Sequence, residues 1–394
     1  MPIALGYGRA PLLLPDGLAG EVLTLPPPPA VPVAAALEAA LRGPVAAPPL
    51  RELAAKAGRA LVILSDASRE EPRAALYAAV RRELSALPDD RVVLAVANGT
   101  HGPARLEELG LPPEVLSRHR IVNHDGRDPG AVVELGCTAR GTRVRVNRCV
   151  LEADLIVVTG RVKPHYFAGW GGGAKGIFPG LGFAEDIRQN HLLKADPASG
   201  LGRADGNPCR EDIEEAVRLT GRPAFLLDVI EISGAVMGAV AGDLVLAHRE
   251  AVRRARPHCE RRAEPADVVV ISAPLPVTGS LYQASKLLPP AGTLLRDGGV
   301  VVLCAECPEG IGPGGPEVVN RAIFELGVRR YLPPRCAVLL VSGMPPEEVA
   351  RTYATYAPSL EAALAEALHV AGTGARLLVI PDGGDLVPLR AEPL

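Results

Sequence analysis

The segment LIVVTGRVKPH (155–165) runs directly into YFAGWGGGAKGIFPG (166–180), and these two segments together decide the fold. The first begins as an uninterrupted apolar run, which is typical of a strand buried on both faces of a parallel sheet. The second surrounds Lys175 with five glycines, at positions 169, 171, 172, 173 and 176. Glycine loses much conformational freedom on folding, so a purely structural loop would rarely carry so many. We therefore interpret this loop as a cradle in which main-chain N–H groups approach a phosphate or a flat ligand.

Two earlier segments have the same pattern of an apolar strand followed by polar residues. ALVILSD (60–66) ends at an aspartate, and RVVLAVANGTH (91–101) ends in a polar turn. Between them, residues 72–87 have the spacing of an amphipathic helix. Because ligands bind at the carboxyl ends of strands in open parallel sheets, the sequence predicts a binding site where these three strands end.

A second block of alternating strands and helices follows a composition break at RRAEPAD (261–267). Alternation of this kind predicts α/β architecture with mostly parallel sheets. We expect two α/β domains, with the active site in the cleft between them. The first domain is predicted to span residues 1–264 and to be joined by the C-terminal tail, 382–394. The second is predicted to span residues 265–381.

Composition and charge exclude several classes of function. Lys and Arg number 42 and Asp and Glu number 45, a net charge of −3, which argues against a general nucleic-acid surface. No apolar run is long enough to span a membrane, and the N-terminus lacks the basic start of a signal peptide. We expect a soluble, cytoplasmic protein with neither nucleic-acid nor membrane partners. Cys304 and Cys307 form a lone CxxC pair, for which buried thiols are a better interpretation than a zinc site.

Three histidines and one lysine near the glycine cluster are candidates for chemistry. His101, His165 and His191 could each be structural when taken one at a time, but all three flank the same cluster. Lys175 does not match a P-loop, because it lies between Ala174 and a glycine. A lysine in this setting either pairs with a phosphate or acts as a nucleophile that forms a covalent adduct.

Two further groups carry side chains suited to a substrate carboxylate. Arg69 can bind a carboxylate through two hydrogen bonds, and Asp66 can orient it; the alternative is a structural ion pair. Tyr282, Gln283 and Lys286 open the first helix of the second block. Their polar groups lie on adjacent helical turns, although a solvated helix face would look the same.

The segments SDASRE, ANGTH, KPHYFAGWGGGAKGIFPG, NH and LYQASK together resemble the nickel-pincer-dependent lactate racemase family. The resemblance covers nearly the whole chain, including the 10-residue interval from His165 to Lys175 and the 16-residue interval from Lys175 to His191. It departs in the loop GWGGGAKG, where the family is expected to have a serine and often an arginine near the lysine.

The resemblance implies a cofactor and a role for each candidate residue. The cofactor would be a nickel-pincer nucleotide of the pyridinium-3,5-bisthiocarboxylic acid mononucleotide type. Lys175 would carry it covalently, and His191 would be the protein ligand to nickel. His101 and His165 would be the paired acid/base residues. Residues assigned to the substrate are Arg69, Tyr282, Gln283, Lys286 and, near the arginine, Asp66; from their place in the loop, Gly171, Gly172, Gly173 and Trp170 are assigned to cofactor binding.

The expected activity is racemisation or epimerisation of a 2-hydroxy acid, lactate or a related acid, by reversible hydride transfer. Two bases with pKa values near neutrality suit a reaction that runs in both directions. Expected partners are the small-molecule substrate and cofactor-maturation enzymes, a sulfur transferase and a nickel insertase. Two alternatives remain open at this point: a lyase that forms a Schiff base on Lys175, and a non-enzymatic protein that binds a phospholigand.

Overall fold

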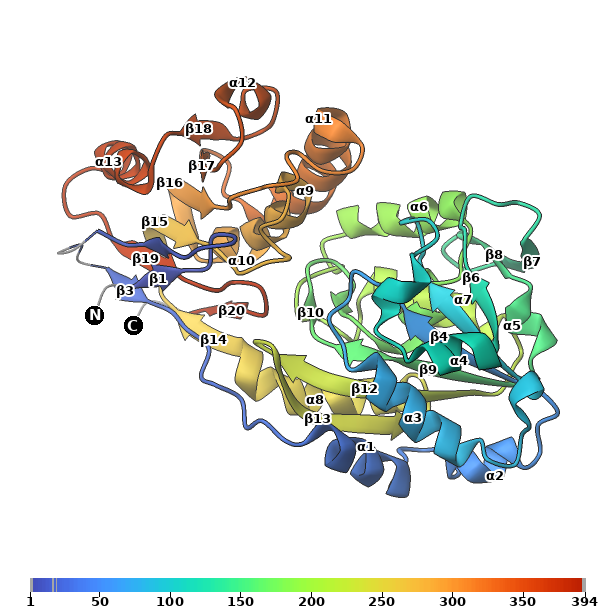
Figure 1. The fold of residues 1–394 in the computed structure, drawn as a ribbon. Coiled ribbons are helices and arrows are strands. Elements are labelled where there is room, and N and C mark those ends of the chain that lie inside the picture. The colour runs from blue at the N-terminus through green and yellow to red at the C-terminus, as the bar shows by residue number, and fades with distance from the viewer. Residues whose placement is uncertain (1–2, 16–17, 19, 392–394) are drawn as a thin grey trace. The chain divides into compact units, whose positions relative to one another are not determined.

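The computed structural model describes residues 3–15, 18 and 20–391. The chain divides into two compact units (Figure 1). We call Pro28–Pro257 the central unit, and Met1–Pro27 together with His258–Leu394 the terminal unit. Each unit contains a mixed α/β arrangement with a mostly parallel sheet, which confirms the predicted fold class.

The sheet of the central unit has six strands in the order β13-β12-β9-β4-β5-β6. Only the hairpin of β12 with β13 is antiparallel. The chain runs outward from β4 through β5 to β6 and then returns to place β9 on the other side of β4. A switch of direction of this kind leaves a crevice at the carboxyl ends of the two strands, here β4 and β9. The strands are β4 (Ala60–Ser65), β5 (Val92–Ala97), β6 (Arg120–Asn123), β9 (Leu155–Val162), β12 (Ala224–Ile232) and β13 (Ala235–Gly242).

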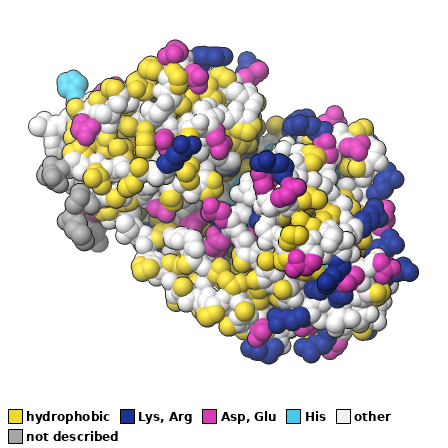
Figure 2. Space-filling model, viewed as in Figure 1, with side chains coloured by type: hydrophobic (Ala, Val, Ile, Leu, Met, Phe, Trp, Pro, Cys, Tyr) yellow, Lys and Arg dark blue, Asp and Glu magenta, His cyan; other side chains and the backbone are white. Residues whose placement is uncertain are grey.

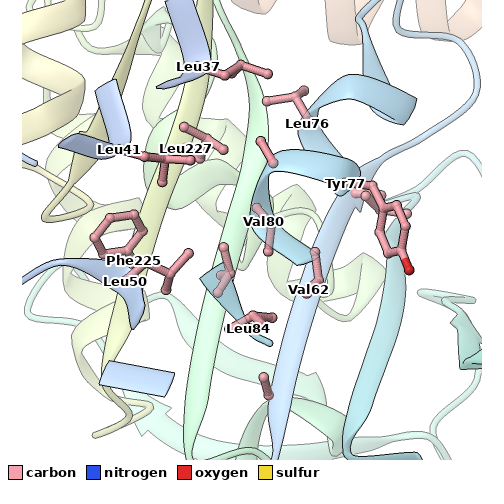
Figure 3. Close-up of a cluster of buried hydrophobic side chains, with 14 of the residues drawn as sticks. Leu37, Leu41, Leu50, Val62, Leu76, Tyr77, Val80, Leu84, Phe225 and Leu227 are labelled. Carbon is pink, nitrogen blue, oxygen red and sulfur yellow. The ribbon is translucent and has the colours of Figure 1, made fainter. Parts of the chain in front are cut away.

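One face of this sheet carries the apolar core of the unit. Residues of α1 and α3 pack over alternate residues of the strands, and Figure 3 shows Leu76 near Leu37 and Val80 near Val62 within one apolar cluster. Alternation along a strand sends its even and odd residues to opposite faces, so Ile63 and Val158 face the other side. That side is covered by the glycine loop.

The remaining elements of the central unit are short helices and two hairpins. The helices are α1 (Val33–Arg42), α2 (Leu50–Ala54), α3 (Arg73–Glu83), η1 (Asp89–Arg91), η2 (Leu106–Leu109), α4 (Pro113–Arg118), α5 (Cys149–Glu152), η3 (Gly173–Gly176), α6 (Ala184–Leu192), η4 (Leu193–Ala195), α7 (Pro208–Arg218) and α8 (Leu246–Cys259). The hairpins are β7 (Val132–Cys137) with β8 (Arg143–Asn147), and β10 (Pro164–His165) with β11 (Gly169–Trp170).

The sheet of the terminal unit is fully parallel and has the order β18-β17-β16-β15-β19-β3. Here too the chain runs outward from one strand, β15, and returns to place a later strand, β19, on its other side. Its strands are β3 (Glu21–Val22), β15 (Ala266–Ile271), β16 (Leu295–Cys304), β17 (Ala337–Val341), β18 (Thr355–Ala357) and β19 (Leu377–Ile380). Its helices are α9 (Leu281–Ala284), η5 (Ser285–Leu287), α10 (Leu288–Thr293), α11 (Gly315–Glu317), η6 (Val318–Val328, of π type), η7 (Arg329–Tyr331), α12 (Pro346–Val349) and α13 (Leu360–Ala371). A hairpin of β1 (Ala4–Leu5) and β2 (Leu12–Leu13) and a pair of β14 (Glu260–Ala263) and β20 (Val387–Arg390) complete it.

The division of the chain differs from the expected one at both ends. The expected first domain included residues 1–27 and the tail from 382. In the structure β3 pairs with β19, and β20 pairs with β14, so the described parts of both segments belong to the terminal unit. A short strand is assigned to a sheet by its backbone partners, and the hydrophobic pattern of a few residues does not specify them.

The face in view carries both signs of charge, and the thiols of the CxxC pair are buried. Figure 2 shows Lys and Arg side chains interspersed with Asp and Glu over the face in view, with no extended patch of one sign. Cys304 and Cys307 are both buried, and burial raises the pKa of each thiol to about 12. Within the described ranges, no helix combines the length and the apolar character needed to span a membrane.

Candidate functional site

The candidate residues of the central unit lie where β4, β5 and β9 end. Asp66 directly follows β4, the turn 98–101 follows β5, and β9 leads into the glycine loop. The loop is joined to the turn after β5, because the N–H of Gly99 donates to the carbonyl of Gly180 at 2.9 Å. The predicted coincidence of three polar strand ends is therefore present in the fold.

Asp66, Arg69 and His101 form one cluster. Oδ2 of Asp66 is 3.2 Å from Nε of Arg69, and Oδ1 is 3.6 Å from Nδ1 of His101. Burial raises the pKa of the Asp66 carboxyl, but hydrogen bonding to His101 and the charge of Arg69 outweigh it and hold that pKa well below its usual range. Asp66 is buried, whereas about half of the Arg69 and His101 side chains is exposed. The buried, ionised carboxylate of Asp66 thus holds a half-exposed guanidinium and a half-exposed imidazole next to each other.

His165 and His191 both contact one aromatic ring, that of Phe167. The centroid of the Phe167 ring is 4.6 Å from that of His165 and 4.9 Å from that of His191, both edge to face. The short β10–β11 pair places His165 opposite Gly169, and α6 carries His191 in its last turn. Nδ1 of His165 accepts the N–H of Ala168 at 3.2 Å. The structure therefore brings these two predicted histidines into one cluster.

Lys175 lies in η3 and is partly exposed. Its charge acts on the Cys209 thiol, as does that of the buried Lys194. Burial nevertheless raises the pKa of Cys209 to about 12, so the thiol stays protonated and donates to Oδ1 of Asn190 at 3.4 Å. The charge of Lys175 thus acts on the thiol that donates to Asn190, and Oδ1 of Asn190 is 3.1 Å from Nδ1 of His191.

The glycine run is explained by contacts inside the protein, which differs from the expected cradle of N–H groups. The N–H of Gly173 donates to Oδ2 of Asp228 at 2.8 Å, and that of Gly171 donates to the carbonyl of Lys163 at 2.7 Å. Gly172 has φ of +72°, and a Cβ there would lie 2.4 Å from Oδ2 of Asp228. Gly172 is needed because a buried carboxyl group approaches the backbone there.

Two more buried side chains hold the carbonyls of this loop. Nε2 of His248 donates to Gly171 at 2.8 Å, and burial lowers the pKa of His248 well below its usual value, so the ring is neutral. Arg210 is fully buried and donates to the carbonyls of Ala168, Trp170 and Gly172. The loop that carries Lys175 is thus fixed from beneath by groups that do not reach the surface.

Trp170 supports the loop instead of lining an open surface. Its side chain is fully buried, and its indole N–H donates to the carbonyl of Gly202 at 2.8 Å. Contact with a cofactor was expected for this residue, but in this arrangement the ring presents no surface to a ligand. The single tryptophan instead ties the loop to the segment before α7.

Sequence reasoning missed Arg210, Asp228 and His248, and also Glu71. A Cβ at Gly160 would lie 3.2 Å from Asp228 and 3.9 Å from Glu71, so two buried carboxyl groups meet beside β9. Burial raises the pKa of each to about 7. One signal was available in the sequence, because Asp228 interrupts the otherwise apolar run AFLLDVI.

The three candidates of the terminal unit form their own group. Tyr282 and Gln283 lie on α9 and Lys286 on η5, after the loop that follows β15. Nζ of Lys286 is 2.5 Å from Oε1 of Gln283 and 5.5 Å from the centroid of the Tyr282 ring. All three are partly exposed. The structure brings them together as predicted from their helical spacing.

Parallel sheets with titratable side chains at the carboxyl ends of their strands are the arrangement in which α/β enzymes place their active sites. The sequence pattern of the family described as Lactate racemase N-terminal domain matches residues 5–202, half of the chain. The chain therefore belongs to the lactate racemase family, and it is an isomerase of the racemase class.

Known relatives and solved structures agree with this placement. The chain is 26% identical over 377 residues to the lactate racemases of Thermoanaerobacterium thermosaccharolyticum and Lactiplantibacillus plantarum, covering 88% of itself and 88–89% of each relative. The lactate racemase apoprotein of the former organism superposes with a TM-score of 0.89 at 26% identity, over 99% of this chain and 100% of that one. A protein from Thermotoga maritima shares the fold, with a TM-score of 0.65 at 17% identity, over 87% of this chain and 97% of that one.

Proposed function

We propose that this chain interconverts the enantiomers of a 2-hydroxy acid, either lactate or a close relative of it. The observation that carries the proposal is the cluster of Asp66, Arg69 and His101 at the strand ends of the central unit. It combines a carboxylate-binding cation with an imidazole next to it, in a family whose curated relatives are lactate racemases.

Arg69 is proposed to bind the substrate carboxylate. Its Nε is held by Asp66, so the guanidinium can present its two terminal nitrogens to a carboxylate as a fork. Tyr282, Gln283 and Lys286 are proposed as further groups for the same carboxylate. The location of the site in a cleft between the two domains stays a prediction.

The two histidines are proposed to move the hydroxyl proton. The carboxylate of Asp66 beside Nδ1 of His101 favours a proton on that nitrogen, which leaves Nε2 to accept the proton of the substrate hydroxyl. Nδ1 of His165 accepts a backbone N–H, so its neutral ring carries the proton on Nε2 and can donate a hydrogen bond to the substrate oxygen; to act as a general acid it must first take up a second proton. In their neutral forms the two rings therefore carry the proton on different nitrogens, His101 on Nδ1 and His165 on Nε2.

The residues present suit a nickel-pincer nucleotide as the cofactor. No three His, Cys, Asp or Glu side chains gather as a metal site in residues 3–15, 18 and 20–391, so a metal here would need donors beyond the protein. Lys175 would carry the cofactor covalently, and His191 would ligate nickel. When bound, the cofactor supplies a hydride acceptor for the substrate carbon. We also propose maturation by a sulfur transferase and a nickel insertase, and activity in the cytoplasm.

Maturation followed by mass measurement tests the proposal. The chain is coexpressed with cofactor-making enzymes, and its intact mass is compared with that of Lys175→Arg. We expect an adduct on the parent chain alone, and racemisation of at least one acid in a panel of single-enantiomer 2-hydroxy acids, followed by chiral chromatography. Replacing His101 by Asn should abolish turnover in both directions and leave the adduct in place.

Two outcomes contradict the proposal. The first is an unmodified mass with no turnover of any acid in the panel. The second is a substrate adduct on Lys175 that borohydride traps, without dependence on nickel, because such an adduct identifies a Schiff-base lyase.

A further inference from the structure

A buried amide lies between His191 and a buried carboxyl group. Asn190, on α6, is fully buried, and its Oδ1 is 3.1 Å from Nδ1 of His191 and 3.4 Å from Sγ of Cys209. Its Nδ2 is 2.8 Å from Oδ2 of Asp212 and 3.4 Å from the carbonyl oxygen of Cys209. An amide donates two hydrogen bonds and accepts two, so all four positions are used.

The partners of this amide fix which edge carries its oxygen. A carbonyl oxygen only accepts hydrogen bonds, so the edge of the amide that faces the Cys209 carbonyl and Asp212 must be the NH2 group. Turning the amide over would place its oxygen against two acceptors in a buried setting, which would leave three polar atoms without donors. The oxygen of Asn190 therefore faces His191.

The carboxyl group of Asp212 is itself held in an accepting state. It is fully buried on α7, and the hydroxyl of Thr138 donates to its Oδ1. That hydroxyl in turn accepts the backbone N–H of Thr142 at 3.1 Å, so its hydrogen is directed to the carboxylate. A chain of hydrogen bonds thus begins at a backbone N–H, whose direction cannot reverse, and ends at Oδ1 of Asn190.

An amide oxygen can only accept, so Nδ1 of His191 must donate. The neutral imidazole then carries its proton on Nδ1, and Nε2 is its unprotonated nitrogen. We propose that Asn190 and Asp212 are positioning residues that hold His191 in the Nδ1–H tautomer and present Nε2 as its metal-binding nitrogen. The metal-binding part rests on the proposed function, whereas the tautomer follows from the hydrogen bonds alone.

Nitrogen NMR on the full chain tests the tautomer directly. The chain is labelled with ¹⁵N-histidine and measured without cofactor at about pH 8, where an ordinary imidazole is neutral. The signals of His191 are assigned by comparison with His191→Gln. We expect the protonated nitrogen to be Nδ1.

The substitution Asp212→Asn should reverse this result. The new amide keeps an oxygen toward Thr138 and presents its NH2 group to Asn190. We expect Asn190 to turn its oxygen toward that group, because the bond it gives up, to the Cys209 carbonyl at 3.4 Å, is the longer of its two donated bonds. Nδ1 of His191 then faces a donor, so we expect the proton to move to Nε2. Glu211→Gln, on the exposed side of the same helix, is the matched control and should leave the tautomer unchanged.

Either a wild-type chain with the proton on Nε2, or Asp212→Asn with the proton still on Nδ1, overturns the tautomer assignment. If Asp212→Asn does not fold, the wild-type spectrum and Asn190→Ala decide, since loss of the acceptor should yield a mixture of tautomers. Nickel retention under dialysis tests the metal role, and matured Asp212→Asn should lose nickel roughly tenfold faster than wild type. Equal retention contradicts that role, while a missing adduct on Lys175 contradicts only the proposed function.

Discussion

The two units share one topology but differ in what they bury. Each sheet runs outward from a first strand, β4 or β15, and returns to place a later strand, β9 or β19, beside it. In each unit some candidate residues follow the first of these strands: Asp66 and Arg69 come after β4, and Tyr282, Gln283 and Lys286 come after β15. The switch point therefore gives both units an equivalent place for polar side chains.

The buried polar groups separate the units clearly. In the described part of the terminal unit they are four hydroxyl residues and one carboxyl residue: Ser272, Thr278, Ser280, Ser285 and Asp385. The central unit buries arginine, lysine, histidine and carboxyl side chains, among them Arg210, His248 and Asp228 beneath the glycine loop. Burying an ionisable group is costly unless it is paired. In the central unit, the buried groups beneath the glycine loop are paired with its backbone, and they fix the conformation of the loop around Lys175.

Loss of the buried guanidinium should produce the largest effect. Arg210→Met removes three hydrogen bonds to carbonyls of the loop, and we expect a loss of about 3–5 kcal/mol in the free energy of unfolding. Trp170 is the single tryptophan and belongs to the central unit, so its fluorescence during urea unfolding follows that unit.

The matched change in the terminal unit is Ser285→Ala, which removes one buried hydroxyl. Its bonds to the carbonyl of Leu281 and to the hydroxyl of Tyr353 predict a loss of about 1 kcal/mol, measured by circular dichroism. Equal losses for the two variants would remove the distinction between the units.

A methyl group in the loop should cost less than loss of the guanidinium. Gly173 has φ of +65°, and a Cβ there would lie 2.9 Å from Cδ2 of the buried His248. Gly173→Ala should therefore combine backbone strain with a steric clash and cost about 2–4 kcal/mol in urea unfolding.

Gly298 in the terminal unit isolates the contribution of strain. It has φ of +77° with no heavy atom within 4 Å of a Cβ, so Gly298→Ala should cost only about 1–2 kcal/mol. If Gly298→Ala costs as much as Gly173→Ala, close contact with His248 is not what requires glycine in the loop.

A further expected effect is a change in the pH dependence of stability. The pKa of Asp228 is about 7 in the folded chain, and an unfolded aspartate releases its proton near pH 4. Between these values the folded chain holds the extra proton, so this stabilisation is complete below about pH 4 and is lost as the pH rises to 7. Asp228→Asn should therefore gain stability relative to wild type by roughly 1 kcal/mol per pH unit between about pH 5 and pH 7.

Asp297→Asn, on the surface of the terminal unit, is the control for this measurement. The Arg335 hydrogen bond lowers the pKa of Asp297, so the carboxylate is charged throughout this range and the difference from wild type should stay flat. Parallel curves for Asp228→Asn and wild type would show that Asp228 does not hold the proton.

Hydrophobic pattern and chain order were sufficient for the fold class and for most strands. The three predicted strands are present as β4 (from ALVILSD), β5 (from RVVLAVANGTH) and β9 (from LIVVTGRVKPH). Apolar runs of this length are typical of strands that are buried on both faces of a parallel sheet. The membership of β3 and β20 in the terminal unit was not predictable, since two to four residues specify no partner. The segment between β5 and β9 contains the β7–β8 hairpin, but its hydrophobic pattern was too weak to predict these two strands.

The candidate site also has features that the sequence predicts and features that it does not. The sequence by itself determined which side chains stand at the strand ends, because residue type and position along the chain are local properties. Only the tertiary structure decided why the glycines are needed and which way Asn190 turns. Those answers depend on Asp228, His248 and Asp212, which come from distant segments and act through buried contacts where no water competes for their hydrogen bonds.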